Sequence, residues 1–115
     1  MKIDIVIVNW NTGNYLKECV LSLIEFNNGN INSIIIVDNN STDNSLKDLP
    51  SKDFIKLIEE KKNHGFGKAC NIGSKYSTEK YILFLNPDTK IFENTLKINL
   101  EFMEKPENSS IAIVG

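Results

Sequence analysis

The 115-residue sequence has little of what marks several large protein classes. It contains two cysteines, Cys19 and Cys70, which lie far apart and within apolar patterns. This spacing excludes a Cys-x-x-Cys metal or redox motif, so we interpret both as small buried side chains in a reducing compartment. The single histidine, His64, follows an asparagine and precedes a glycine, and we interpret it as a turn or surface residue rather than a catalyst.

The sequence also has no excess of positive charge. Its 13 Lys and Arg residues and 15 Asp and Glu residues give a formal net charge of −2. Nucleic-acid-binding surfaces are normally basic, so we predict no nucleic-acid partner. No apolar run approaches the roughly 18 residues of a membrane span, and the first run is short and contains Asp4, unlike a secretory signal. We therefore expect no membrane span in this chain, and a cytoplasmic protein that can lie at the inner face of the membrane.

Four short segments have the composition and length of buried strands, being rich in apolar and β-branched residues. The uninterrupted run Ile34–Val37 is typical of a strand that is covered on both faces of a sheet. A further apolar segment, Ile111–Val114, resembles another buried strand just beginning at the end of the sequence. The four predicted strands are 3–8, 34–37, 54–58 and 81–85.

Between these strands, apolar residues recur at the spacing of one helix face. The alternation of strand and helix with short connections predicts an α/β fold in a single domain, 1–115. We expect a Rossmann-like, mainly parallel sheet with helices on both faces. The predicted helices carry Leu16, Cys19, Val20, Leu23 and Ile24; then Leu46 and Leu49, ending at Pro50; then Ala69, Ile72, Gly73 and Tyr76; and last Leu96, Leu100 and Met103, with Asn94 or Thr95 as cap.

Polar clusters rich in Asn and Asp follow all four predicted strands. In an open parallel sheet, ligands bind outside the carboxyl ends of the strands, so we expect these clusters to meet at one edge. Trp10 lies within the first cluster, where it can pack under the sheet edge or flank a ligand, and we favour packing under the sheet edge. The clusters are Asn9–Asn11, Asp38–Ser41, Asn63–Gly65 and Asn86–Asp88.

The common phosphate-binding loops are missing. The stretch Gly65–Cys70 lacks the last glycine of G-x-G-x-x-G and also lacks the G-x-x-x-x-G-K-[ST] frame. A nucleotide would therefore be held by side chains, helix N-termini and a metal ion. Asp38 can accept hydrogen bonds from a base or ribose, or it can close an Asx-turn with Ser41 or Thr42. Asp88 behind Pro87 suits Mg²⁺ or Mn²⁺ that bridges two phosphates, or it belongs to a plain Pro-Asp turn.

Taken together and in this order, the clusters resemble the start of a family 2 glycosyltransferase with the GT-A fold. The resemblance covers essentially the whole chain, and its last segment occupies the place of the DXD motif, with Asn86 where the stricter motif has an acid. This Asn-Pro-Asp form resembles the rhamnosyltransferase-like branch, which uses dTDP-sugars for bacterial surface polysaccharide. The matching segments are Ile5–Asn11, Val37–Asp43, Asn63–Asn71 and Phe84–Thr89.

The resemblance implies the N-terminal, nucleotide-sugar-binding part of an enzyme that transfers sugar, with inversion, from a dTDP- or UDP-sugar to a glycan or lipid-linked acceptor. Mg²⁺ or Mn²⁺ on the diphosphate would be held by Asp88. The catalytic base is expected beyond Gly115, so we expect these 115 residues alone not to transfer sugar efficiently. The nucleotide-sugar-binding residues implied are Asn9, Asn11, Asp38, Asn63, Asn71, Asn86 and Asp88.

Two other functions stay open. The first is a nucleotide-binding module without transfer activity. The second is a receiver-type signalling domain, whose length and α/β pattern fit and for which Asp88–Lys90 offers an acid, a hydroxyl and a lysine. A receiver domain needs an acidic pair directly after the first strand, where this chain has Asn9–Asn11.

Overall fold

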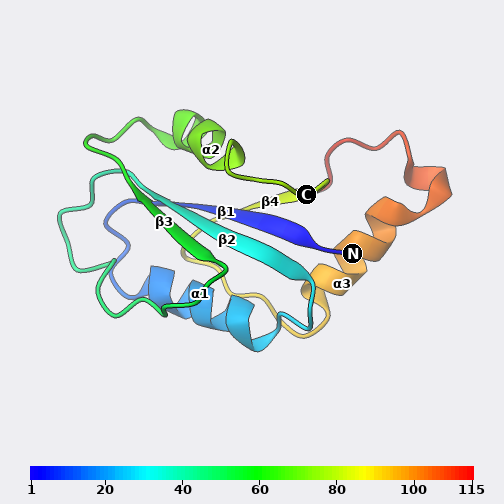
Figure 1. The fold of residues 1–115 in the computed structure, drawn as a ribbon, viewed down its shortest axis with the longest axis horizontal. Coiled ribbons are helices and arrows are strands. Elements are labelled where there is room, and N and C mark those ends of the chain that lie inside the picture. The colour runs from blue at the N-terminus through cyan, green and yellow to red at the C-terminus, as the bar shows by residue number, and fades with distance from the viewer.

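The computed structural model describes all 115 residues as one α/β domain (Figure 1). Its four strands form a single parallel sheet in the order β3-β2-β1-β4, so the first strand of the chain lies in the middle. This confirms the predicted fold class. The elements are β1 (Ile3–Asn9), α1 (Tyr15–Glu25), β2 (Ile31–Asp38), β3 (Ile55–Glu59), α2 (Phe66–Ser74), β4 (Ile82–Leu85), α3 (Thr95–Glu104) and the 3₁₀ turn Pro106–Asn108.

The helices cover both faces of the sheet because alternate strand residues point to opposite sides. On one face, Ile5 and Ile7 of β1 pack with α1 and α3 in the larger core cluster. On the other face, Val6 and Val8 pack with Ala69 of α2 in a smaller cluster. Figure 1 shows α1 and α2 on opposite sides of the strands. The continuous apolar run in the sequence therefore reflects a sheet buried on both faces.

Gly73 allows α2 to lie close against the sheet. A Cβ atom at this position would lie 2.5 Å from Cγ1 of Val6 and 3.1 Å from Cγ2 of Val37. Any larger residue would therefore push the helix away from the strands. The glycine lies on the predicted inner face of this helix, beside Ala69.

Two predicted elements are wrong. The segment that carries Leu46 and Leu49 forms turns instead of a helix, although both side chains still pack against the core. Forming the first turn of a helix costs free energy that so short a segment cannot recover. In addition, Asp48 adopts a positive φ of 57°, which is incompatible with a right-handed helix. Ile111–Val114 forms no strand and does not pair with the free edge of β4, and Ile113 is 89% exposed.

Smaller expectations were partly confirmed. Cys19 is completely buried, whereas Cys70 is only half-buried. Asn94 is the N-cap residue of α3, but it has φ 66° and its side chain makes no capping hydrogen bond. Instead, the Thr95 hydroxyl accepts the N–H of Phe92 at 3.0 Å. None of the helices combines the length and the hydrophobicity that crossing a membrane requires.

A buried carboxylate, Asp4, joins three segments at the amino ends of the strands. Its Oδ1 accepts a hydrogen bond from the Asn32 amide at 2.8 Å and another from the Ser33 hydroxyl. Its Oδ2 accepts hydrogen bonds from the loop between α2 and β4. Burial raises the pKa of Asp4, but the hydrogen bonds outweigh burial and hold this pKa well below its usual range. The donors in that loop are the Ser77 hydroxyl at 2.7 Å and the N–H groups of Thr78 at 2.8 Å and Glu79 at 3.0 Å.

We predict that Asp4→Asn lowers the free energy of unfolding at pH 7 by about 2–4 kcal/mol, because one amide oxygen cannot accept all five bonds. A carboxyl whose pKa falls on folding stabilises the protein above its unfolded pKa and loses this effect as pH falls. The difference between the two proteins should therefore shrink below about pH 4. Urea unfolding from pH 7 to pH 3 measures it, with exposed Asp53→Asn as the control. A constant difference across this range would contradict the role of Asp4.

Candidate functional site

The carboxyl ends of the strands surround a pocket of about 280 Å³. Each of the four predicted polar clusters contributes at least one residue to its wall, so they meet at one edge of the sheet as expected. A larger groove of about 670 Å³ lies beside β4 and α3, but 13 of its 17 lining residues are hydrophobic and no polar cluster faces it. The smaller pocket is therefore the candidate site. Its lining residues are Val8, Trp10, Thr12, Asn39, Asn63, Gly65, Phe66 and Pro87.

Beneath this pocket, Asn9 and Asp38 join the ends of β1 and β2. They are register partners in the parallel ladder, and both are buried. The Asn9 amide nitrogen donates to Asp38 Oδ1 at 2.9 Å and to the Ser45 hydroxyl at 2.9 Å. The Thr12 hydroxyl donates to the Asn9 amide oxygen. Asn9 is completely buried, so the expectation that it lies directly beside a nucleotide needs correction: its polar atoms serve the loops below.

Asp38 closes an Asx-turn, one of the two interpretations that the sequence left open. Its Oδ2 accepts the N–H of Ser41 at 2.9 Å, and its Oδ1 accepts the Ser41 hydroxyl at 2.7 Å. The side chain is 2% exposed and does not line the pocket. In this structure its two carboxylate oxygens therefore accept hydrogen bonds from Asn9 and Ser41.

Asn39, the next residue, contributes to the pocket wall and was not singled out in the sequence. Its amide nitrogen donates to the Gly65 carbonyl at 3.2 Å, and its amide oxygen accepts the N–H of His64 at 3.4 Å. Because successive residues of an extended chain point to opposite sides, Asp38 and Asn39 serve different partners. The adjacent Asn-Asn pair after an acid was the only sequence signal for this residue.

The loops after β1 and β2 are joined by further hydrogen bonds. Asn11 adopts a positive φ of 51°, which asparagine tolerates, and its amide oxygen accepts the N–H of Thr42 at 2.8 Å. Asp43 Oδ2 accepts the N–H of Gly13 at 2.9 Å. Hydrogen bonds from Ser45, and more weakly from Gly13, lower the pKa of Asp43. Asn11 and Asp43 therefore fix the two loops to one another.

Two exposed aromatic side chains line the pocket. Trp10 is 52% exposed and Phe66 is 57% exposed, and they come from the loop after β1 and from the first residue of α2. The expectation that Trp10 packs under the sheet edge is therefore wrong. The buried positions at the end of β1 are already filled by Val8 and Asn9, so the following side chain turns outward.

The segment before α2 reaches the pocket through Asn63 and Gly65. The Asn63 amide oxygen accepts the N–H of Gly65 at 2.8 Å, and Gly65 has a φ of 81° that favours glycine. Asn71 was expected to help shape the pocket, but it is exposed and does not line it. It lies more than one turn into α2, whereas only the start of that helix meets the pocket.

Asn86, Pro87 and Asp88 form the predicted turn after β4. The Asn86 carbonyl accepts the N–H of Thr89 at 3.2 Å and its hydroxyl at 2.7 Å. Pro87 lines the pocket, whereas the Asp88 carboxylate is exposed and has no hydrogen-bond or ion-pair partner within the chain. Cys19 lies beneath this turn, where burial and, more weakly, the charge of Asp88 raise the pKa of its thiol to about 11.

The site has few groups that can hold a metal ion. No cluster of three or more His, Cys, Asp or Glu side chains is placed to bind one. Asp88 offers one unpartnered carboxylate, and Asn86 offers an exposed amide two residues before it. Mg²⁺ is commonly held by one or two carboxylates together with substrate phosphates and water. This set of oxygen atoms therefore fits a cation that arrives with a diphosphate, and it does not form a cage made of protein atoms alone.

Comparison with known families agrees with this arrangement. The model of the family described as "Glycosyl transferase family 2" matches residues 4–114, nearly the whole chain. The chain belongs to glycosyl transferase family 2. This membership confirms the family to which the sequence clusters pointed and does not support the receiver-type alternative.

Individual proteins are also similar to this chain over most of its length. A Rickettsia bellii protein named as an uncharacterized glycosyltransferase is 34% identical over 105 residues, which are 90% of this chain and 15% of that protein. The minor teichoic acid biosynthesis protein GgaB of Bacillus subtilis is 30% identical over 112 residues, 91% of this chain and 12% of GgaB. The chain therefore spans less than a fifth of the length of either relative.

A solved structure supports the fold of this family 2 chain. The crystal structure of S. aureus TarS residues 1–349 superposes with a TM-score of 0.78 at 26% identity, covering 90% of this chain and 32% of that one. The chain therefore has the fold of a GT-A glycosyltransferase. The pocket lies at the carboxyl ends of the parallel strands, where ligands bind in open α/β sheets.

The contact between Asn9 and Asp38 gives a direct test of how the site is held. We predict that Asn9→Asp lowers the free energy of unfolding at pH 7 by about 3 kcal/mol or more, because a second buried carboxylate replaces the amide donor and faces Asp38. Chemical unfolding measures the loss. Asn44→Asp makes the same charge change on an exposed side chain without a hydrogen bond and should change stability by less than about 0.5 kcal/mol. Equal effects of the two substitutions would contradict the proposed contact.

Proposed function

We propose that this chain is the nucleotide-sugar-binding part of a family 2 glycosyltransferase, with Mg²⁺ or Mn²⁺ as its cofactor. The observation that supports this most directly is the pocket that two exposed aromatic side chains, Trp10 and Phe66, share with the turn before Asp88. An aromatic surface, polar backbone and one unpartnered carboxylate match the three parts of a donor: a base, a diphosphate and the cation that accompanies it.

The base binds against the aromatic side chains. Stacking of a base on an aromatic side chain contributes about 1–3 kcal/mol and is available to any base, so it supplies affinity without selecting the nucleotide. A volume of about 280 Å³ is at the lower end of ligand pockets, which suits a nucleoside and leaves the sugar outside. Among the residues that the resemblance implied, Asn63 lines this pocket directly. Asn9, Asn11 and Asp38 hold the loops that frame it.

The diphosphate lies toward Asp88 in this proposal. Asp88 would hold the divalent cation, with the Asn86 amide oxygen beside it, and the cation would neutralise charge on the diphosphate as it leaves. Pro87 restricts the backbone between these two residues, so the carboxylate is held in a narrow range of directions. The chain supplies a single carboxylate here, so we expect the cation to bind weakly until the nucleotide is present.

The proposal also covers the reaction of the whole protein. The whole protein would transfer a hexosyl or deoxyhexosyl group, with inversion, from a dTDP- or UDP-sugar to a glycan or lipid-linked acceptor. This reaction would take place at the cytoplasmic side of the membrane. The name of its relative GgaB connects that protein with teichoic acid synthesis and supports a role in bacterial surface polysaccharide. The base that deprotonates the acceptor is expected outside these 115 residues. Without that catalytic base, the chain alone acts as a nucleotide-binding module, the first of the two other functions that the sequence left open.

A panel of UDP-, dTDP- and GDP-sugars, each with and without Mn²⁺, tests this proposal by thermal unfolding. We predict that one nucleotide stabilises the chain, by about 2.7 kcal/mol at a concentration of 100 times its dissociation constant, and that Mn²⁺ strengthens the effect. Asp88→Ala should remove the Mn²⁺-dependent part, whereas Asp53→Ala, at another exposed carboxylate, should leave it intact. Stabilisation by none of the nucleotides would overturn the proposed function, and an unchanged Mn²⁺ effect in Asp88→Ala would overturn the metal role.

A further inference from the structure

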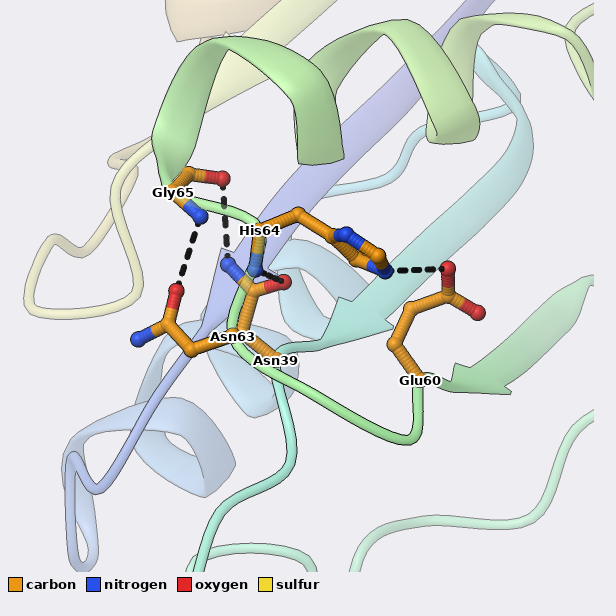
Figure 2. Close-up of polar contacts among 5 residues, drawn as sticks. All are labelled: Asn39, Glu60, Asn63, His64 and Gly65. Atoms are coloured by element: carbon orange, nitrogen blue, oxygen red, sulfur yellow. Dashed lines mark hydrogen bonds and ion pairs between the residues drawn. The ribbon is translucent and has the colours of Figure 1, made fainter.

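His64 lies beside the pocket without lining it, and neither the sheet nor the proposed donor site accounts for its side chain. Its ring is only 12% exposed, and Nε2 lies 3.1 Å from Oε1 of Glu60, whose side chain is 25% exposed. Figure 2 shows the ring directed toward Glu60, away from Asn63 and Gly65. The residues on either side of His64 thus face the pocket, while His64 itself points to a partner behind it.

The Glu60–His64 ion pair closes a loop. The two residues are four apart, but residues 60–64 are not helical, so the pair does not follow from regular helix geometry. Glu60 directly follows β3, and its N–H donates to the Asp38 carbonyl at 2.9 Å. The ion pair therefore connects the fixed end of the sheet with the residues that begin α2, across the exposed residues Lys61 and Lys62.

Asn39 fixes the same loop from the other side. Its amide oxygen accepts the N–H of His64 and its amide nitrogen donates to the Gly65 carbonyl, at 3.4 and 3.2 Å (Figure 2). Asn39 is itself 2% exposed at the end of β2. One buried amide thus holds the backbone at the N–H of His64 and at the carbonyl of Gly65, while the His64 ring contacts Glu60.

We propose that the contact between the Glu60 carboxylate and the His64 ring and the hydrogen bonds of the Asn39 amide together hold residues 63–66 in the conformation that lines the pocket, which makes His64 a positioning residue for the nucleotide. This inference rests on the proposed function. When a loop is already ordered in the free protein, ligand binding does not have to supply the entropic cost of ordering it. The Glu60–His64 contact therefore strengthens binding without touching the nucleotide. His64 is therefore neither a catalyst nor a passive surface residue.

The experiment compares Glu60→Ala, His64→Ala and the double variant. Trp10 is the only tryptophan and lines the pocket, so its fluorescence reports the binding of UDP, dTDP and GDP in the presence of Mn²⁺. We expect each single variant to bind the preferred nucleotide about two to five times more weakly, which corresponds to the upper part of the range measured for a partly exposed pair. The double variant should be no weaker than either single variant, because all three lose the same contact.

Two further variants separate this contact from general effects. Glu59→Ala removes the neighbouring exposed carboxylate, which forms no ion pair, and should bind nucleotide as the unchanged chain does. The exchanged pair, Glu60→His with His64→Glu, should recover part of the lost affinity. Additive losses in the double variant, or unchanged affinity in properly folded single variants, would overturn the proposal.

Amide hydrogen exchange gives a readout that needs no nucleotide. Exchange at Gly65, Phe66 and Ala69 should be faster in Glu60→Ala and in His64→Ala than in Glu59→Ala. If the unchanged chain binds none of the three nucleotides, the proposed function fails, and the exchange rates alone then decide the role of the ion pair. Equal exchange in all variants would show that Glu60 and His64 do not hold the loop.

Discussion

The site depends on one buried contact, the hydrogen bond from the Asn9 amide to the Asp38 carboxylate. These residues end the two central strands of the sheet, and their side chains are occupied entirely by each other and by the loops that follow. A carboxylate can only accept hydrogen bonds, so the contact also determines which end of the Asn9 amide points toward Asp38. The loops after β1 and β2 both begin at this contact. The pocket is lined by residues of these loops and of the start of α2.

The chain uses carboxylates in two opposite ways. Asp4 lies at the amino ends of the strands and Asp38 at their carboxyl ends, and both are buried and accept hydrogen bonds from several donors. No buried side-chain nitrogen or oxygen lacks a hydrogen-bond partner. Asp88 is exposed and has no partner within the chain. Burying a charge is costly unless donors surround it, so the first two carboxylates stabilise the fold. The third remains available to a cation and a diphosphate.

The sequence predicted the architecture well, because apolar periodicity reports directly which side chains are buried. It also predicted that the four polar strand ends meet. It failed where the outcome depends on what a segment meets in three dimensions. Ile111–Val114 has strand composition but does not pair with the sheet, and Trp10 turns outward because its neighbours fill the core. Asp38 and Asn39 are adjacent and chemically similar, and only the backbone direction determines that the second contributes to the pocket.

In the proposed function the nucleotide binds at the polar strand ends rather than in the larger apolar groove beside β4 and α3. The most direct measurement is an amide and indole NMR titration of the ¹⁵N-labelled chain with UDP or dTDP in the presence of Mg²⁺. We expect the resonances of the Trp10 indole and of the amides of Asn39, Gly65 and Phe66 to shift together with one dissociation constant. Shifts confined to Ile82–Leu85 and Leu100, which line the apolar groove, would contradict it.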